Sequence, residues 1–360
     1  MVPTQDGDIY AAAKTAGVAV EEILDFSACV SAAPMPDPVR RALQEAGAHL
    51  GRTPDPAARN LRELASKRFG VYPVQVLAGC DTVEFLYAIP RALRPRRVVV
   101  LAPCPQDYWR AVEFAGGETE GVLSIEPNEL VPDLAQVASR LSGVDMVYVG
   151  NPNNPTGVAL PAEALTGLAR RFPTVTFVID ETLAEFLPES QGFSLLPRTP
   201  PANVIVLRSP SPFAGLAGLR AGFMIGSEDL CGLVDRAREP QRMSLPAMLV
   251  AEALLADPRP AAEARQEVIA ERERLRDLLS HTPGLRVFRS QANFLLLKIT
   301  RPGLTSTELC ERLLRRRILV RNASAFRGLD GRYLRITVRT AADNDRLMDA
   351  MKLALDEGKS

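Results

Sequence analysis

The sequence has little lysine and no excess of either charge. Only five of its 43 basic residues are lysine (positions 14, 67, 298, 352 and 359), and it has just two histidines. The 43 Lys and Arg residues balance 43 Asp and Glu residues, so no global field recruits nucleic acid or an anionic membrane. We therefore expect neither a nucleic-acid nor a membrane partner.

Long apolar runs and a basic leader are also missing. No stretch approaches the ~20 apolar residues of a membrane span. The N-terminus MVPTQDGDIY carries acidic residues where a signal peptide carries positive ones. These absences predict a cytoplasmic protein. The five cysteines are an odd number without a C-x-x-C pair, which favours reduced thiols over a disulfide framework.

The sequence does contain the pattern of an α/β protein with two cores. Its 360 residues exceed the ~250–300 at which one hydrophobic core stops growing. Helical spacing occupies 106–116, 130–141 and 161–171. Strand-like apolar runs flank these helices, at 96–102, 145–150, 176–180, 203–209 and 221–226. This alternation predicts a doubly wound α/β core on a parallel sheet.

The texture changes near residue 258. A charged amphipathic helix begins there and ends at Gly284. Shorter strands then interleave with helices, the strands at 285–288, 293–299 and 333–338 and the helices at 305–316 and 341–357. This part is expected to form a smaller α+β domain of about a hundred residues.

Polar side chains follow the predicted strands, where open α/β sheets bind ligands. Asn154 lies in the NPNNPTG turn after the second strand, and Asp180 ends the third. The segment RSPSPFAGLAGLRAG then supplies Ser209, Ser211 and Arg220. Upstream, GCDTVEFLYAIPRAL (79–93) opens a helix whose free N–H groups form an anion site. Together these groups suit a ring bearing a phosphate, although each alone is equally typical of a turn, a helix cap or a surface ion pair.

Seven ordered blocks extend this pattern over nearly the whole chain. They include DGDIYAAAKTAGVAVEEILDFSA (6–28), NPNNPTG (151–157), VIDETLAEF (178–186), GLAGLRAG (215–222) and RNASAFRGLDGRYLRITVRTAADNDRL (321–347). The set resembles the fold type I pyridoxal-phosphate enzymes, in particular the branch of histidinol-phosphate aminotransferases and threonine-phosphate decarboxylases. The resemblance implies a large domain at 45–257, a small domain at 258–360 joined by an N-terminal arm at 1–44, and a homodimer.

The resemblance also implies residue roles. Asn154 would contact the phenolic oxygen of the cofactor and Asp180 its pyridine nitrogen. Thr82, Ser209, Ser211 and Arg220 would surround its phosphate. Arg335 would hold a substrate carboxylate, a task that suits the planar guanidinium. Arg339 is four residues further on, so on a strand it would face the same side and could join an anion site with Arg321.

The chain departs from the family pattern at the residue that matters most. The family has Ser-x-Ser-Lys, whose lysine forms the Schiff base, and this chain has Ser209-Pro210-Ser211-Pro212. Proline has no side-chain amine, so no catalytic residue can be assigned at this position. Further family aromatics fall at Pro105, Leu183 and Thr53, and the phosphate turn reads Cys80-Asp81-Thr82. We expect the Asp81 carboxylate to repel a phosphate.

Two main interpretations remain open. The first is a lysine-less homologue that binds a small anionic metabolite, amino-acid-like or phosphate-like, without internal-aldimine chemistry. The alternative is an aminotransferase or amino-acid-phosphate decarboxylase that holds pyridoxal or pyridoxamine phosphate noncovalently. A structural or regulatory partner of an active relative is a third. Cys29, Cys80 and Cys104 fall in blocks that line the family pocket. Their wide spacing favours space-filling thiols over a metal site.

Overall fold

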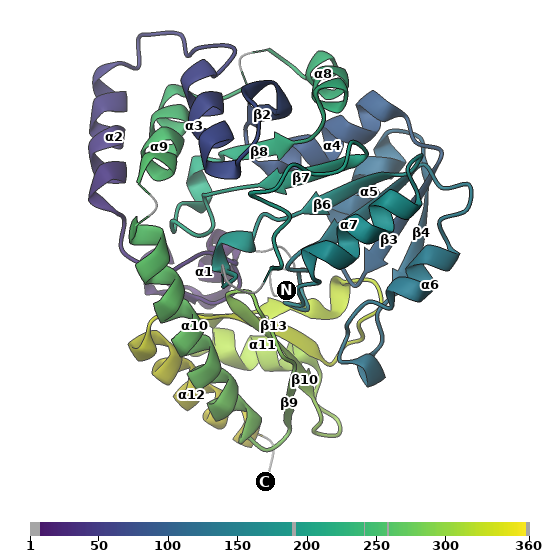
Figure 1. Ribbon diagram of the computed structural model, residues 1–360. Coiled ribbons are helices and arrows are strands. Elements are labelled where there is room, and N and C mark those ends of the chain that lie inside the picture. Colours follow the sequence, from purple (N-terminus) through teal and green to yellow (C-terminus); the bar gives the residue numbers. More distant parts are fainter. Residues whose placement is uncertain (1–7, 189–191, 241, 258, 358–360) are drawn as a thin grey trace.

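The computed structural model describes residues 8–188, 192–240, 242–257 and 259–357 (Figure 1). The larger domain is built on a seven-stranded sheet with the order β2-β8-β7-β6-β5-β3-β4. Its strands are β2 (Val76–Gly79), β3 (Arg97–Ala102), β4 (Glu118–Leu123), β5 (Met146–Gly150), β6 (Thr176–Asp180), β7 (Val204–Arg208) and β8 (Gly222–Ile225). The doubly wound α/β core predicted from the sequence is confirmed.

One strand of this sheet runs against the others. β8 pairs antiparallel with both β2 and β7, whereas the pairings among β3, β4, β5, β6 and β7 are all parallel. The expectation of a parallel sheet therefore fails at β8. A parallel connection needs a crossover, usually a helix, and residues 209–221 hold only the short turn Ala217–Leu219. This loop, which carries the altered Ser-x-Ser-Pro motif, lies at the sheet edge where β7 ends.

Helices cover both faces of the sheet (Figure 1). Ile179 and Val206 pack with helices α3 and α9 on one face, and the alternate residues Val178 and Leu207 pack with α4 and α5 on the other. We call these the α3 face and the α4 face. The helices are α3 (Arg59–Phe69), α4 (Thr82–Leu93), α5 (Gln106–Phe114), α6 (Leu134–Ser139), α7 (Ala162–Arg171), α8 (Glu228–Arg236) and α9 (Leu245–Ala256).

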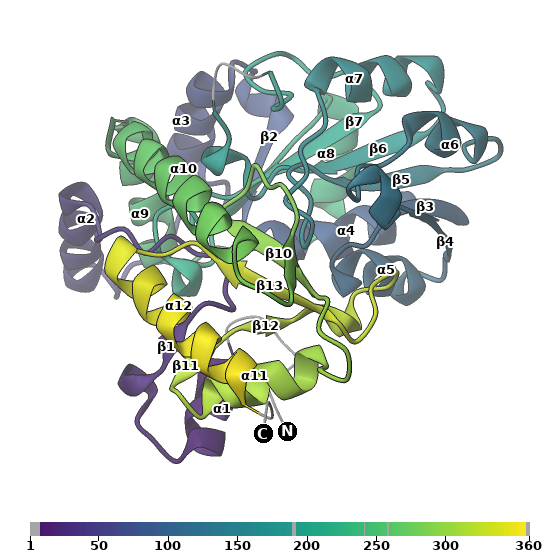
Figure 2. The ribbon, with the colours of Figure 1, turned by 90° about the horizontal axis from the view of Figure 1, so that it is seen from below.

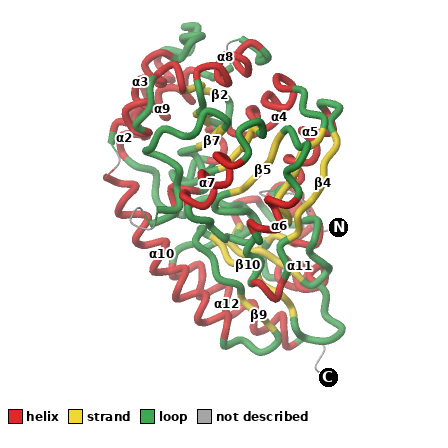
Figure 3. Tube along the Cα trace, turned by 45° about the vertical axis from the view of Figure 1, so that its right-hand side comes forward, coloured by secondary structure: helices red, strands yellow, loops and turns green. Residues whose placement is uncertain are grey.

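The smaller domain is a four-stranded antiparallel sheet with the order β12-β13-β10-β9. Its strands are β9 (Leu285–Val287), β10 (Phe294–Ile299), β12 (Arg321–Asn322) and β13 (Tyr333–Thr337). Three helices enclose its core, α10 (Arg259–Ser280), α11 (Ser306–Leu314) and α12 (Ala341–Asp356). Figures 2 and 3 show α10 and α12 side by side along this domain. Thr305 and Thr340 start α11 and α12 as N-caps, accepting backbone N–H bonds.

The N-terminal arm is shared between the domains. α1 (Ile9–Ala16) packs on the small domain, and β1 (Leu24–Asp25) pairs with β11 (Ile318–Leu319) there. α2 (Asp37–Ala48) instead packs Val39 and Ala42 against Val250 of α9 in the large domain. The expected boundary at residue 44 thus falls inside α2, because that helix has its apolar face on the large domain. Short 3-10 turns lie at Val20–Glu22, Pro73–Gln75, Glu126–Asn128, Ala184–Phe186 and Ala323–Ala325.

No helix among the described residues combines the length and apolarity needed to cross a bilayer.

Candidate functional site

The place at the start of α4 where the sequence predicts an anion site contains a carboxylate from the chain itself. Asp81 Oδ2 lies 2.7 Å from Arg220 Nη2, and Asp81 Oδ1 accepts a 2.6 Å hydrogen bond from the backbone N–H of Thr82. The Thr82 hydroxyl donates to the same oxygen at 3.2 Å. Helix N-termini and guanidinium groups both bind anions. Asp81 therefore occupies the environment in which the sequence predicts a ligand phosphate.

The backbone at this turn is tight. Asp81 has φ 79° and ψ 165°, a region that is essentially restricted to glycine. A Cβ on Gly222 of β8 would lie 2.5 Å from the carbonyl carbon of Asp81 and from the nitrogen of Thr82. The neighbouring strand therefore lies directly against the turn. A glycine at position 222 is required for this approach.

The loop that follows β7 is fastened to itself. The hydroxyls of Ser209 and Ser211 donate to the carbonyl of Ala221 at 2.8 and 3.3 Å, and both side chains are buried. The carbonyl of Pro212 accepts a 2.8 Å hydrogen bond from the N–H of Ser31. The two serines thus fix the segment that carries Arg220.

Asp180 is held at the end of β6 by neighbouring side chains. The Tyr108 hydroxyl donates to Asp180 Oδ2 at 2.8 Å, and the backbone N–H of Thr182 donates to Oδ1 at 3.0 Å. The Thr182 hydroxyl also contacts Oδ1, and it lies 2.9 Å from the hydroxyl of Thr82. Burial raises the pKa of Asp180, with the hydrogen bonds from Thr182 and Tyr108 opposing the rise. A continuous polar chain thus runs from Tyr108 through Asp180 to the Asp81 turn.

Asn154 and Arg335 meet between the two domains. Arg335 Nη1 donates to Asn154 Oδ1 at 2.6 Å, and Nη2 donates to the carbonyl of Ser27. The guanidinium lies 5.2 Å from the centre of the Phe294 ring, and Arg335 is fully buried. The amide predicted to face a cofactor and the guanidinium predicted to face a substrate are therefore hydrogen-bonded to each other.

The expected arginine face on the last strand is only partly present. Arg321 of β12 is paired in register with Arg335 of β13, and its guanidinium lies 5.4 Å from the Phe326 ring. Arg339 is not on the same strand face, because β13 ends at Thr337. Its guanidinium instead donates to Asp343 at 3.1 Å and to the carbonyl of Asp25 at 3.1 Å. Arg339 therefore ties α12 to the N-terminal arm.

The three pocket cysteines do not form a ligand cluster. Cys104 is buried, Cys29 is half-buried and Cys80 is exposed. Burial raises the pKa of Cys104 to about 12. No group of three potential metal-ligating side chains occurs within the described ranges. Lys298, the lysine in the small-domain block, forms an ion pair with Glu126.

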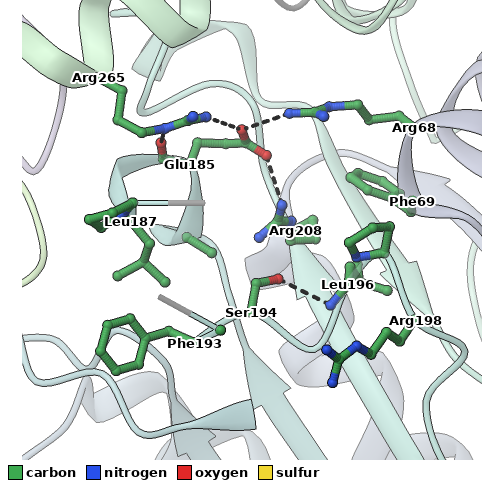
Figure 4. A pocket seen from close by; sticks show the side chains of 14 residues that line it. Arg68, Phe69, Glu185, Leu187, Phe193, Ser194, Leu196, Arg198, Arg208 and Arg265 are labelled. Carbon is green, nitrogen blue, oxygen red and sulfur yellow. Dashed lines mark hydrogen bonds and ion pairs between the residues drawn. The ribbon is translucent and has the colours of Figure 1, made fainter. Parts of the chain in front are cut away.

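Sequence reasoning missed a charged cluster on the α3 face of the sheet. Arg208 Nη1 lies 3.1 Å from Glu181, and its Nη2 lies 2.8 Å from Glu185. Arg68 and Arg265 each approach Glu185 at 3.5 Å (Figure 4). Burial raises the pKa of Glu181. The same effect opposes ionisation of Glu185, but the three arginines outweigh it and its pKa is lowered. The available signal was position along the chain, since Glu181 directly follows the predicted strand 176–180 and Arg208 lies near the end of the predicted strand 203–209.

Comparison with known proteins shows which family the chain belongs to. The model for "Aminotransferase class I and II" matches residues 21–351. The chain belongs to this family. It is 30% identical to the threonine-phosphate decarboxylase of Salmonella typhimurium over 352 residues, 97% of this chain and 96% of that protein. It is also 30% identical to histidinol-phosphate aminotransferase 2 of Archaeoglobus fulgidus over 334 residues, 92% and 93% of the two chains.

Solved structures agree on the fold of this aminotransferase family member. The L-threonine-O-3-phosphate decarboxylase of Porphyromonas gingivalis matches with a TM-score of 0.85 and 26% identity, covering 93% of this chain and 100% of that one. The histidinol-phosphate aminotransferase of Sinorhizobium meliloti, solved in complex with pyridoxal-5'-phosphate, matches with a TM-score of 0.87 and 23% identity, covering 96% and 94%. The expected fold type I aminotransferase-like architecture is confirmed.

The residues of this chain do not fit a covalently held pyridoxal phosphate. Position 212 offers no amine, and Asp81 fills the anion site with a carboxylate. A phosphate placed about 4 Å from that carboxylate meets a repulsion of about 4 kcal/mol per charge at an effective dielectric near 20. We derive no reaction step through this cofactor.

Proposed function

We propose that this member of the class I and II aminotransferase family binds a small anionic metabolite without internal-aldimine chemistry. The observation that carries the proposal is the pairing of Asp81 with Arg220 at 2.7 Å, together with the proline at position 212 where the family has its lysine. The phosphate anchor and the Schiff-base anchor are thus both altered at one site. Two independent losses in one site favour a changed function over a weakened one.

The class of ligand follows from the cations that remain near the site. Arg335 is buried between the domains, with Asn154 beside it, and Arg321 lies opposite it on the next strand. A guanidinium suits a carboxylate or phosphate in a bidentate pair. We therefore propose an amino-acid-like or phosphate-like ligand, and a homodimer as the working form. Arg339 is the weakest member of this set because Asp343 already engages it.

The proposal is tested by adding pyridoxal phosphate to the purified protein, reducing with borohydride and locating adducts by mass spectrometry. We expect no stoichiometric adduct at any single lysine, only scattered modification of exposed amines such as Lys14, Lys67 and Lys352. One stoichiometric adduct on one lysine refutes the proposal. A Pro212→Lys variant that gains Schiff-base absorption, where wild type shows none, contradicts our claim that Asp81 prevents phosphate binding. The pocket would then lack only the lysine that bonds to the cofactor.

A second candidate function is an aminotransferase or decarboxylase that uses noncovalent pyridoxal or pyridoxamine phosphate. Asp180 favours it, because a carboxylate has about four acceptor positions and three are filled here, leaving one for a ring nitrogen. Carbon dioxide release from L-threonine O-3-phosphate in the presence of added pyridoxal phosphate supports this candidate. Its absence, together with no heat of binding for pyridoxamine phosphate, excludes it.

A further inference from the structure

We propose that a cavity on the α3 face of the large sheet, opposite the Asp81 turn, binds a small dianion such as phosphate or a phosphate monoester. The cavity has a volume of about 370 Å³, which suits a compact metabolite. Four guanidiniums and one carboxylate belong to its described lining, from Arg68, Arg198, Arg208, Arg265 and Glu185. Figure 4 shows the five side chains around the same space.

The inner wall of the cavity is positive despite its carboxylates. Arg208 is buried, with its side chain 9% exposed, and it is shared by Glu181 and Glu185. Its Nε is buried and has no hydrogen-bond partner among the described residues. Glu185 is surrounded by guanidiniums: in Figure 4, Arg265 and Arg68 approach its carboxylate from opposite sides and Arg208 approaches from below. Buried donors without partners are uncommon in folded proteins and call for an explanation.

The outer wall supplies a cation, Arg198, that is held only by a long and exposed ion pair in the described structure. The Arg198 side chain is 76% exposed, and its ion pair in the described structure is a 3.9 Å approach to the exposed Glu163. In Figure 4 Arg198 lies across the cavity from the Glu185 cluster. Ser194, whose hydroxyl donates to Glu181 at 2.7 Å, lines the space between them. An anion entering here gains Arg198 and Arg68 without displacing a buried pair.

The charge count decides the sign of the ligand. Among the described lining residues, the arginines exceed Glu185 by three, and by two when Glu181 behind Arg208 is included. A dianion neutralises this excess, whereas an amine would add to it. Guanidinium forks bind phosphate oxygens in pairs. A phosphate group is thus the matching ligand chemistry.

This site is separate from the one in which the family binds its cofactor. Asp180 faces Tyr108 of α5, whereas Arg208 lies 5.5 Å from the ring of Phe69 at the end of α3. The sheet therefore stands between the two regions. The inference does not depend on the proposed function, because no residue of the Asp81 turn contributes to it.

The test is calorimetric titration of the full chain with inorganic phosphate at low ionic strength, combined with phenylglyoxal labelling of arginines read by mass spectrometry. The variants are Arg198→Gln and Arg68→Gln, with Arg346→Gln as the control, an exposed arginine on α12. We expect roughly tenfold weaker phosphate binding in each cavity variant, since each loses a charge-assisted hydrogen bond. The control should bind phosphate as tightly as wild type. Phosphate should also protect Arg198 from labelling.

Three results overturn the inference. The first is no phosphate binding at millimolar concentration. The second is an equal loss of affinity in Arg198→Gln and Arg346→Gln, which would indicate general charge attraction. The third is protection of Arg220 instead of Arg198, which would place the anion at the Asp81 turn. Arg198 is largely exposed, so its replacement should not disturb folding. Circular dichroism spectra should be recorded to check the fold of every variant.

Discussion

Replacing Asp81 by glycine should open the anion site at the start of α4. The side chain contributes a carboxylate 2.7 Å from Arg220 and one helix-capping bond to Thr82. Its backbone has φ 79°, where a non-glycine residue costs about 1–3 kcal/mol. Asp81→Gly removes the charge and relieves the backbone strain. Asp81→Asn removes the charge but leaves the backbone strain in place. The two variants therefore separate charge from conformation.

The expected changes in stability and in affinity differ greatly. Because Arg220 is 49% exposed, the ion pair contributes at most about 1 kcal/mol, and glycine is a tolerable N-cap at a cost of a few tenths. We expect the unfolding free energy of Asp81→Gly to stay within about 1 kcal/mol of wild type. For a phosphate ligand, removing a repulsion of about 4 kcal/mol per charge corresponds to about a thousandfold. Partial exposure reduces this, so about a hundredfold is expected.

Pyridoxamine phosphate and pyridoxamine are suitable probes, because neither carries an aldehyde that modifies surface lysines. Isothermal titration should show the phosphate ester binding Asp81→Gly and Asp81→Asn about a hundredfold more tightly than wild type, with pyridoxamine unchanged. Equal gains for both probes would place the effect on the ring. If neither variant binds the ester better than wild type, Asp81 does not occupy an anion site and our reasoning is wrong.

Two further predictions concern thiols and pH. At pH 8 a thiol reagent should label exposed Cys80 and leave Cys104, Cys231 and Cys310 unmodified. Burial raises the pKa of these three thiols to about 12, so almost none of the reactive thiolate forms. Mass spectrometry of the native protein after labelling checks this. Labelling of the three before unfolding contradicts it. Hydrogen bonding from Lys298 lowers the pKa of Glu126, so its contribution is present above pH 4.5 and lost as pH falls through the lowered value. Glu126→Gln should cost about 2 kcal/mol at pH 7 by urea unfolding, and the difference should vanish in acid; a difference independent of pH refutes this.

Sequence patterns predicted the parts of the fold in which local and global preferences agree. The apolar runs ending at Gly150 and Asp180 became β5 and β6, because Val and Ile between helices are stable only in a sheet covered on both faces. Their position also predicted Asp180 at the ligand edge of the sheet. The antiparallel strand β8 was not predicted as such, since a buried apolar run has no direction of its own.

Side-chain partners could not be predicted, because they depend on contacts distant in the sequence. Asp81 and Arg220 are 139 positions apart, and only the fold brings them to 2.7 Å. The expectation that Asp81 would repel a phosphate stays a prediction, and it was made without knowledge of this partner. Arg339 was misplaced for a local reason, since β13 ends two residues before it. A strand end is harder to locate than a strand.

Asp180 and Glu181 are consecutive, yet their carboxylates serve opposite sides of the sheet. The peptide unit between them is clamped, because the Asp180 carbonyl accepts from the N–H of Asn151 at 2.8 Å and the Glu181 N–H donates to the Leu207 carbonyl at 2.9 Å. These two hydrogen bonds fix the backbone between the region of the Asp81 turn on one face of the sheet and the Arg208 cavity on the other. We therefore expect substitutions at the Asp81 turn to leave the backbone around Arg208 in place, so that a scaffold of this kind can change the site on one face of the sheet and keep the other.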